Sequence, residues 1–469
     1  MALGRRKEKQ TELFIATKEL VKGPGHPFYT KLNKVLADAG FDGFVEELCE
    51  SYYKKGGRPS IAPGIYFRML FIGYFEGLGS QRGIAWRCAD SLALRDFLGV
   101  SYTEATPVHA SMTIIRKRLP EMVFDQVFQF VLKQLKEKGV LKGKTLGIDA
   151  TTLEANAAMK SIERKDTGQD WNQYLKELAQ AEGIENPTQE DLRRMDKGRK
   201  DKKVSNQQWQ SRTDPEAKIT KMKDGRTHLA YKAEHGVDLE SEAIVSAHVT
   251  SADRSDSQTG PESLAVAQAN LIAADRQIEV KEMVADKGYH DNRLLTQCEE
   301  RQVRTYIPER RQKTRRWTDK PPGYEKAFRG NRRRVRGAKG KRLSRWRSER
   351  CERTFAHVCE TGGGRRTWLR GLENTGKVHT LRCAAYNLGV LLRKVWGICK
   401  PRNTSDGLKG SILAILGLWT LLAAVVHGGG KGIEAGIVAV VAAAIITVLW
   451  LLSMRPKAHS KISPFLTGC

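Results

Sequence analysis

The sequence predicts a mixed α/β protein: a mixed sheet flanked by helices, with an all-helical N-terminal domain and an apolar helical C-terminal tail. Three observations predict this class. Apolar residues at helical spacing dominate the first 140 residues, strand-like and helical runs alternate beyond Gly143, and two nearly uncharged stretches follow residue 405. We expect domains at 1–140, 141–400 and 405–469, which suits a chain of 469 residues.

The first domain is expected to be helical along its whole length. Residues 61–100 contain few β-branched runs, and apolar residues recur near helical spacing over 108–138. Pro107 and Pro120 are expected to start or bend helices. Two interpretations remain open, a plain helical scaffold and a DNA-binding module of helix-turn-helix type.

The second domain is expected to contain the sheet. In chain order we expect a strand (144–149), a hairpin (228–237 and 243–249), a helix (261–274), a strand (280–285), a helix (292–301) and a strand (303–307). Residues 160–218 are polar and of mixed charge, which predicts an insertion or a mobile linker. This order of elements predicts strands of mixed direction.

Positive charge is concentrated in one segment. The chain has 80 Lys plus Arg against 53 Asp plus Glu, a net charge of +27. Residues 310–350 contain 18 basic residues and three acidic ones, with aromatic residues between them. Such a segment is often only a solvated surface. Its density of charge favours phosphate binding, with the rings of Trp317, Tyr324, Phe328 and Trp346 free to stack on unpaired bases.

The cysteines and the chain ends bear on the cellular compartment. None of the eight cysteines forms a C-x-x-C pair, so a zinc ribbon is not expected. Residues 1–10 are basic and no apolar run follows them, so we expect no secretory signal and a reduced cytoplasmic setting. Residues 412–426 and 437–454 are apolar, and only the second approaches the length of a membrane span. A membrane hairpin, a buried helical pair and a dispensable tail are the interpretations.

Three acidic residues stand out by their context: Asp149, Asp286 and Glu352. Each aspartate ends a strand-like run, and the glutamate follows the basic segment. Carboxylates at the ends of neighbouring strands can converge with one from a packed helix, giving hard oxygen ligands for Mg²⁺ or Mn²⁺. Two such ions about 4 Å apart support phosphodiester chemistry. The alternative is that each acid only caps a turn or a helix.

Four motifs resemble the DDE transposases of bacterial insertion sequences. They are GIDATTLEANAA, PEAKITKMKDGRTHLAYK, VADKGYHDN and RSERCERTFAHVCETGGGRRTWLRG, in that order along the chain. The resemblance implies an RNase H-like catalytic fold and strand cleavage with strand transfer that depend on Mg²⁺ or Mn²⁺. It also implies double-stranded DNA, both element ends and target, as the partner, and a homo-oligomer on that DNA.

Carried over position by position, the resemblance assigns catalysis and metal binding to Asp149, Asp286 and Glu352. The family often has Tyr and Arg upstream of its glutamate, where this chain has Arg345 and Ser348. This departure makes Glu349 the alternative third acid, because residues 349 and 352 share one helix face. Tyr289 and His290 follow the second aspartate, where either could position DNA or simply pack.

The basic segment before Glu352 is expected to bring DNA to the acids. The expected DNA-binding residues are Arg332, Arg333, Arg334, Arg345, Arg347, Arg350 and Arg353. Phosphate contacts position DNA but do not read its sequence, so no recognised base sequence follows.

The expected function is that of a cytoplasmic, nucleoid-associated transposase. It would bind the ends of its element, hydrolyse a strand there and join a 3′-hydroxyl to target DNA. Two alternatives remain: a catalytically inactive DNA-binding remnant, and a membrane-associated basic protein organised by the C-terminal tail.

Overall fold

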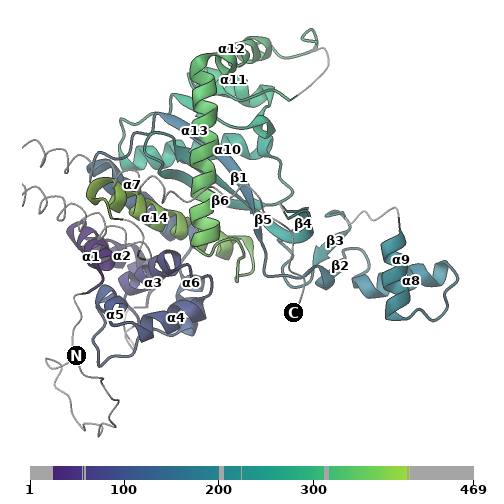
Figure 1. The fold of residues 1–469 in the computed structure, drawn as a ribbon, viewed down its shortest axis with the longest axis horizontal. Helices are drawn as coiled ribbons and strands as arrows, with labels where there is room; N and C mark the ends of the chain where they lie inside the picture. The colour runs from purple at the N-terminus through teal and green to yellow at the C-terminus, as the bar shows by residue number, and fades with distance from the viewer. Residues whose placement is uncertain are drawn as a thin grey trace, which may run out of the picture. The chain divides into compact units, whose positions relative to one another are not determined.

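The computed structural model describes residues 25–54, 56, 60–199, 205–222, 224–310, 316–398 and 401. Figure 1 shows N-terminal helices followed by a mixed sheet with helices on both faces. The predicted α/β class is therefore confirmed. The apolar tail and its predicted membrane hairpin lie outside these residues. In the described part of the chain, no helix combines the length and the apolar character needed to cross a membrane.

The N-terminal region is helical, as predicted. Its helices are α1 (Pro27–Asp38), α2 (Phe41–Cys49), η2 (Glu50–Tyr52), α3 (Pro63–Glu76), α4 (Gln81–Asp90), α5 (Leu92–Leu98), α6 (His109–Arg118) and α7 (Glu121–Glu137). Pro120 is the N-cap of α7 and separates it from α6, since proline suits a helix start but not a helix interior. Helix α3 is buried on nearly every side and forms the centre of this region.

The N-terminal helices and the sheet share one hydrophobic core. Its members run from Phe28 in α1 to Leu392 in α14 (Leu372–Trp396) without a break at residue 140. Helix α14 contacts α3 and α7 as well as strand β6 (Ile244–Ser251). The predicted boundary at 140 thus marks the change from helices to sheet and does not separate two cores.

The central sheet is of mixed direction, as the RNase H-like expectation requires. The strands are β1 (Thr145–Glu154), β4 (Lys218–Lys221), β5 (Thr227–Asp238), β6, β7 (Glu282–Val284) and β8 (Arg304–Tyr306). Their order is β4-β5-β1-β7-β8, and β6 also pairs with β5. Strand β5 runs antiparallel to β1, β4 and β6, whereas β7 is parallel to both β1 and β8.

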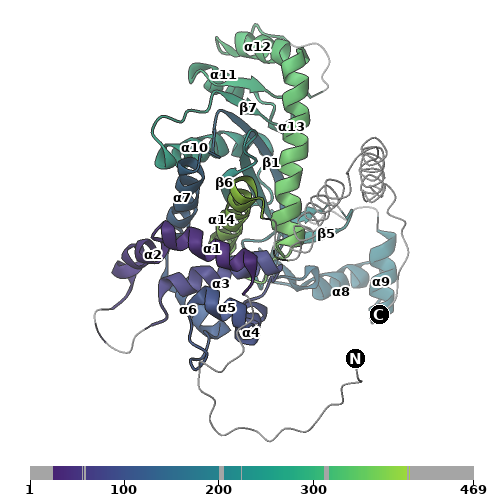
Figure 2. The same ribbon diagram turned by 60° about the vertical axis from the view of Figure 1, so that its left-hand side comes forward.

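Helices cover both faces of this sheet. Helix α10 (Asp256–Ala274) contacts β1, β5 and β6, and the long helix α13 (Ala338–Phe355) crosses β1, β5, β7 and β8 (Figure 2). The approach of α13 depends on Gly147 in β1. A Cβ atom there would lie 2.5 Å from the Leu239 side chain and 3.2 Å from Cys351 Sγ of α13. Close packing of α13 on β1 thus requires glycine at this position.

Two segments are more ordered than their composition predicts. The polar segment 160–218 contains η3 (Met159–Ser161), β2 (Ile162–Arg164), α8 (Trp171–Ala181), α9 (Gln189–Gly198) and β3 (Trp209–Ser211). It has a small core of its own around Leu175 and Leu192, so it is a folded insertion and not a linker. After β7 the chain forms η4 (Lys287–Tyr289) and α11 (Asn292–Glu300). The basic segment follows and forms α12 (Tyr324–Arg336) and most of α13. A π-helical turn, η5 (Ala356–Thr361), continues α13.

Candidate active site

The two candidate aspartates lie level with each other just beyond the paired stretch of β1 and β7. Asp149 is in the middle of β1 and not at the end of a strand as predicted, because β1 continues to Glu154 alongside β5. Gly147 of β1 pairs with Val284 of β7 in parallel register, and the same register two residues further on brings Asp149 level with Asp286. Neighbouring strands are about 4.8 Å apart, and side chains at equivalent positions leave the same face. Asp149 thus lies on the face that α13 covers, where Arg347 of α13 pairs with it, and Asp286 follows β7 at the same level.

Asp286 is held at the point where the chain leaves β7. It is the N-cap of η4, and its Oδ1 accepts a hydrogen bond of 2.7 Å from the Gly288 amide. A Cβ atom on Gly288 would lie 2.9 Å from Asp286 Oδ1 and 2.4 Å from Asp256 Oδ2. Both carboxylates thus crowd one glycine, which leaves no room for a larger residue.

Helix α13 brings Glu352 toward the same region. Glu352 is exposed and its Oε1 accepts a hydrogen bond of 3.1 Å from Ser348 Oγ. Five residues earlier on α13, Arg347 Nη1 lies 2.9 Å from Asp149 Oδ2. Burial raises the pKa of the Cys351 thiol between them, and the charges of Asp149 and Glu352 raise it further.

The three acids do not close around one point. In the described residues, one group of three metal-ligating side chains has its ligand atoms within 4.8 Å of one another. That group contains none of the three acids. Arg347 of α13 is instead paired with Asp149 Oδ2 at 2.9 Å. The alternative acid, Glu349, is exposed and lies 2.5 Å from Arg353. The assignment of the third acid to Glu352 or to Glu349 stays a prediction.

A buried polar network that the sequence did not indicate lies on the face of β5 opposite to Asp149, against α10. Lys232 Nζ is 2.7 Å from Asp256 Oδ1, 2.9 Å from Thr259 Oγ1 and 3.4 Å from Glu234 Oε2. Glu234 is fully buried and also accepts a hydrogen bond from Ser263. Lys232 and Glu234 are two residues apart in a strand, so their shared face could have revealed the pair.

The predicted DNA-binding arginines divide into engaged and exposed side chains. Arg332 pairs with Glu309 at 3.1 Å, and Arg353 pairs with Glu242 at 2.9 Å. Arg334 is turned inward, because its guanidinium donates to the carbonyl and hydroxyl oxygens of Thr305.

The remaining arginines of the prediction lie nearer to solvent or to the acids. Arg333 and Arg345 are exposed, whereas Arg350 lies over the ring of Trp346 at 4.2 Å. Arg332 is exposed too, although it pairs with Glu309, so Arg332, Arg333 and Arg345 are the exposed cations of the predicted set.

Three rings near the site are structural. Tyr289 is fully buried and packs against Gly260 of α10, and His290 is 8% exposed. These positions favour packing over contact with DNA. Phe328 is buried against Trp317, at a ring distance of 5.0 Å, so the prediction that its ring stacks on bases is wrong. Its position on the inward face of α12 could not be read from a segment so rich in charge.

Comparison with known families agrees with the predicted resemblance. A family model described as a transposase domain matches residues 16–118, and one described as a transposase DDE domain matches residues 186–388. Together they match about two thirds of the chain. No curated protein and no solved structure matches it. The two matches, in this order and over this fold, show that the chain belongs to the DDE-type transposases.

Proposed function

We propose that this transposase cleaves and joins DNA strands in a reaction that depends on Mg²⁺ or Mn²⁺ held by Asp149, Asp286 and Glu352. The observation that carries the proposal is the parallel register of β1 and β7, which brings Asp149 in the middle of β1 level with Asp286 just after β7. Helix α13, which carries Glu352, supports it because α13 packs on β1 and its Arg347 pairs with Asp149.

The donor set suits the proposed ions. All three residues offer hard carboxylate oxygens, which Mg²⁺ and Mn²⁺ prefer. When bound, such ions activate a water or a 3′-hydroxyl and stabilise the leaving oxygen. In the metal-free protein the Arg347 guanidinium neutralises Asp149 at 2.9 Å. We expect Arg347 to exchange this carboxylate for a phosphate of the bound DNA strand, a partner that guanidinium groups bind well.

The DNA-binding surface is proposed to include α12, α13 and the N-terminal helices. The N-terminal region matches a transposase domain, and its helix α4 buries only Ile84 and Cys88. The exposed side of α4, with Arg82 and a Trp86 that is 69% exposed, is the part we assign to the element ends. Assembly as a homo-oligomer on DNA at the nucleoid belongs to the same proposal.

Strand cleavage by the purified chain is the direct test. A labelled duplex made from the DNA that flanks the coding sequence supplies the element ends. With Mg²⁺ we expect nicked ends and products joined to a second duplex, and with EDTA neither. Salt-sensitive binding without any product in Mg²⁺ or Mn²⁺ would instead identify a binding-only remnant.

Replacement of the exposed arginines is expected to weaken DNA binding. The double substitution Arg333→Ala and Arg345→Ala removes two phosphate contacts, so the slope of log K against log salt should fall by about 1.8. Fluorescence anisotropy at several salt concentrations measures it. Arg194, exposed on the insertion, is the matched control, and Arg194→Ala should leave the slope unchanged. Equal slopes for the wild type, the double variant and Arg194→Ala would show that α12 and α13 are not part of the DNA-binding surface.

A methyl group on Gly288 is expected to displace Asp286. The added Cβ would lie 2.4 Å from Asp256 Oδ2 and 2.9 Å from Asp286 Oδ1, so the carboxylates or the loop must shift, and a shift of about 1 Å at a catalytic group costs about 10²-fold in rate. Single-turnover cleavage by Gly288→Ala measures this. Gly43→Ala, at a helical position with open space around it, is the control and should keep full activity. Full activity of Gly288→Ala would exclude Asp286 from the site.

A further inference from the structure

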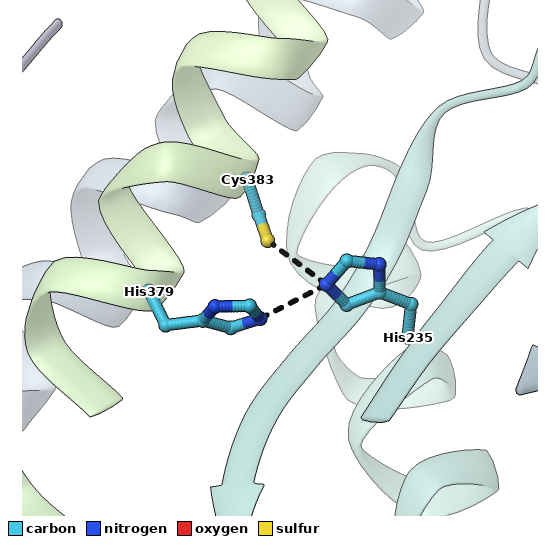
Figure 3. Close-up of side chains that lie close together, drawn as sticks. All are labelled: His235, His379 and Cys383. Carbon is cyan, nitrogen blue, oxygen red and sulfur yellow. Dashed lines mark hydrogen bonds between the residues drawn. The ribbon is translucent and has the colours of Figure 1, made fainter. Parts of the chain in front are cut away.

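A buried group of nitrogen and sulfur donors lies between β5 and α14 (Figure 3). His235 of β5 is the register partner of Asp149 in β1. His379 and Cys383 are one helical turn apart on α14, so they present their side chains on the same face. His235 and Cys383 are fully buried, and His379 is 1% exposed.

Hydrogen bonds determine where His235 carries its proton. His235 Nδ1 lies 3.0 Å from Thr354 Oγ1, and that hydroxyl donates its own proton to the Cys351 carbonyl at 2.8 Å. A threonine hydroxyl has only one proton, so it must accept from the imidazole N–H. His235 is therefore protonated on Nδ1, and its Nε2 has a free lone pair.

That lone pair faces two donors at once. His235 Nε2 lies 2.9 Å from His379 Nε2 and 3.4 Å from Cys383 Sγ. Burial lowers the pKa of both histidines and raises that of the thiol, so all three groups are neutral at pH 7. His379 Nδ1 has no hydrogen-bond partner among the described residues. The three side chains by themselves thus offer two donors for one lone pair and leave one nitrogen unsatisfied.

We propose that His235, His379 and Cys383 bind one d¹⁰ metal ion, Zn²⁺ or Cu⁺. Their ligand atoms all lie within 4.8 Å of one another. Ordinary zinc bond lengths place two imidazole nitrogens about 3.3 Å apart and a nitrogen and a thiolate sulfur about 3.6 Å apart. The present distances of 2.9 Å and 3.4 Å differ from these by a few tenths of an ångström, so small side-chain movements admit the ion.

The proton balance of binding is simple. Cys383 releases its thiol proton to solvent, and His379 carries its proton on Nδ1, which leaves three lone pairs for the ion. The hydrogen bond from His235 to Thr354 persists and orients the ring, as outer hydrogen bonds of metal-bound histidines do. Imidazole and thiolate donors select Zn²⁺ or Cu⁺ over Mg²⁺, which separates this site from the carboxylates.

The bound ion would join three elements around the candidate active site. It would link β5, beside Asp149, to α14, and through Thr354 to α13, which carries Glu352. His235 also stacks on Phe355 of α13, with ring centroids 4.2 Å apart. The complete burial of the donors indicates a structural ion. The ion would bind whether or not the chain performs strand transfer.

Metal content of the full chain tests the inference. Protein purified without chelator is analysed for zinc and copper by mass spectrometry. Metal-free protein is then titrated with Zn²⁺, with Cu⁺ under reducing conditions, and with Co²⁺ as a spectroscopic probe. We expect about one equivalent of Zn²⁺ or Cu⁺, a raised melting temperature and a thiolate-to-cobalt charge-transfer band. The two titrations show which ion binds more tightly.

Matched variants locate the ion. Cys383→Ser and His379→Gln should each lower the affinity at least about tenfold and abolish the cobalt band or shift it. Cys298→Ser, at a fully buried cysteine of α11, should bind metal like the wild type, and so should Asp286→Asn. A wild-type chain that binds neither ion, with an unchanged melting temperature, would overturn the proposal. Binding that survives Cys383→Ser unchanged, or is lost in Asp286→Asn, would also overturn it.

Discussion

Replacement of Asp149 by Asn is expected to lower Mg²⁺-dependent cleavage and joining of element-end DNA by at least about 10³-fold. The amide loses the charge that holds a divalent ion, and metal stabilisation of the transition state is worth several kcal/mol. The side chain keeps its shape, so the fold and the affinity for DNA should persist. Single-turnover cleavage and binding assays at equal salt concentration separate the two effects.

The control for this prediction is Asp253→Asn. Asp253 follows β6 and accepts a hydrogen bond of 2.6 Å from Ser251, so it caps a turn near the same motifs. Its replacement should change the cleavage rate less than about twofold, because exposed polar substitutions are usually mild. An Asp149→Asn protein that cleaves at the wild-type rate would show that Asp149 does not belong to the catalytic machinery.

Replacement of Lys232 by Met is expected to destabilise the folded chain by about 3–5 kcal/mol. Lys232 is the cation within 3.4 Å of Glu234, a carboxylate with no solvent exposure. Removal of one partner leaves an uncompensated buried charge, which is the costly outcome for a buried ion pair. Urea unfolding at pH 7 measures the loss.

A second substitution distinguishes the lost charge from lost packing. Glu234→Gln in the Lys232→Met background removes the unpaired charge and should restore much of the stability. Lys136→Met, at the more exposed pair with Asp275, should cost at most about 1 kcal/mol. If Lys232→Met lowers the free energy of unfolding by less than about 1 kcal/mol, the hydrogen bonds from Thr259 and Ser263 suffice to stabilise the Glu234 carboxylate.

Much of the fold was predictable because its elements are local patterns. Strand-like runs predicted β1, β5 to β8 and their mixed direction, and Pro120 separates α7 from α6 as expected. The sequence predicts that α10 starts at Pro261, which is five residues too late. The helix begins at Asp256, since Ser255 and Gln258 form a capping box that tolerates proline in the turns that follow. The order within segment 160–218 was missed because its apolar residues are few and widely spaced.

The candidate site was less predictable, since its contacts join residues far apart in the chain. The resemblance pointed to the acids, but not to the ion pair between Asp149 and Arg347 or to the crowding of Gly288 by Asp256. Composition also cannot separate an exposed arginine from one like Arg334, whose donors face Thr305. These contacts depend on strand register and helix packing.

Diffraction from crystals of the protein with element-end DNA and Mn²⁺, with anomalous scattering used to locate the manganese, tests the central assignment most directly. We predict Mn²⁺ bonded at about 2.2 Å to carboxylate oxygens of Asp149 and Asp286, with Glu352 completing the site and Arg347 turned to a phosphate. Manganese bound to other side chains, with Asp149 still paired to Arg347 beside the cleaved strand, would contradict the assignment.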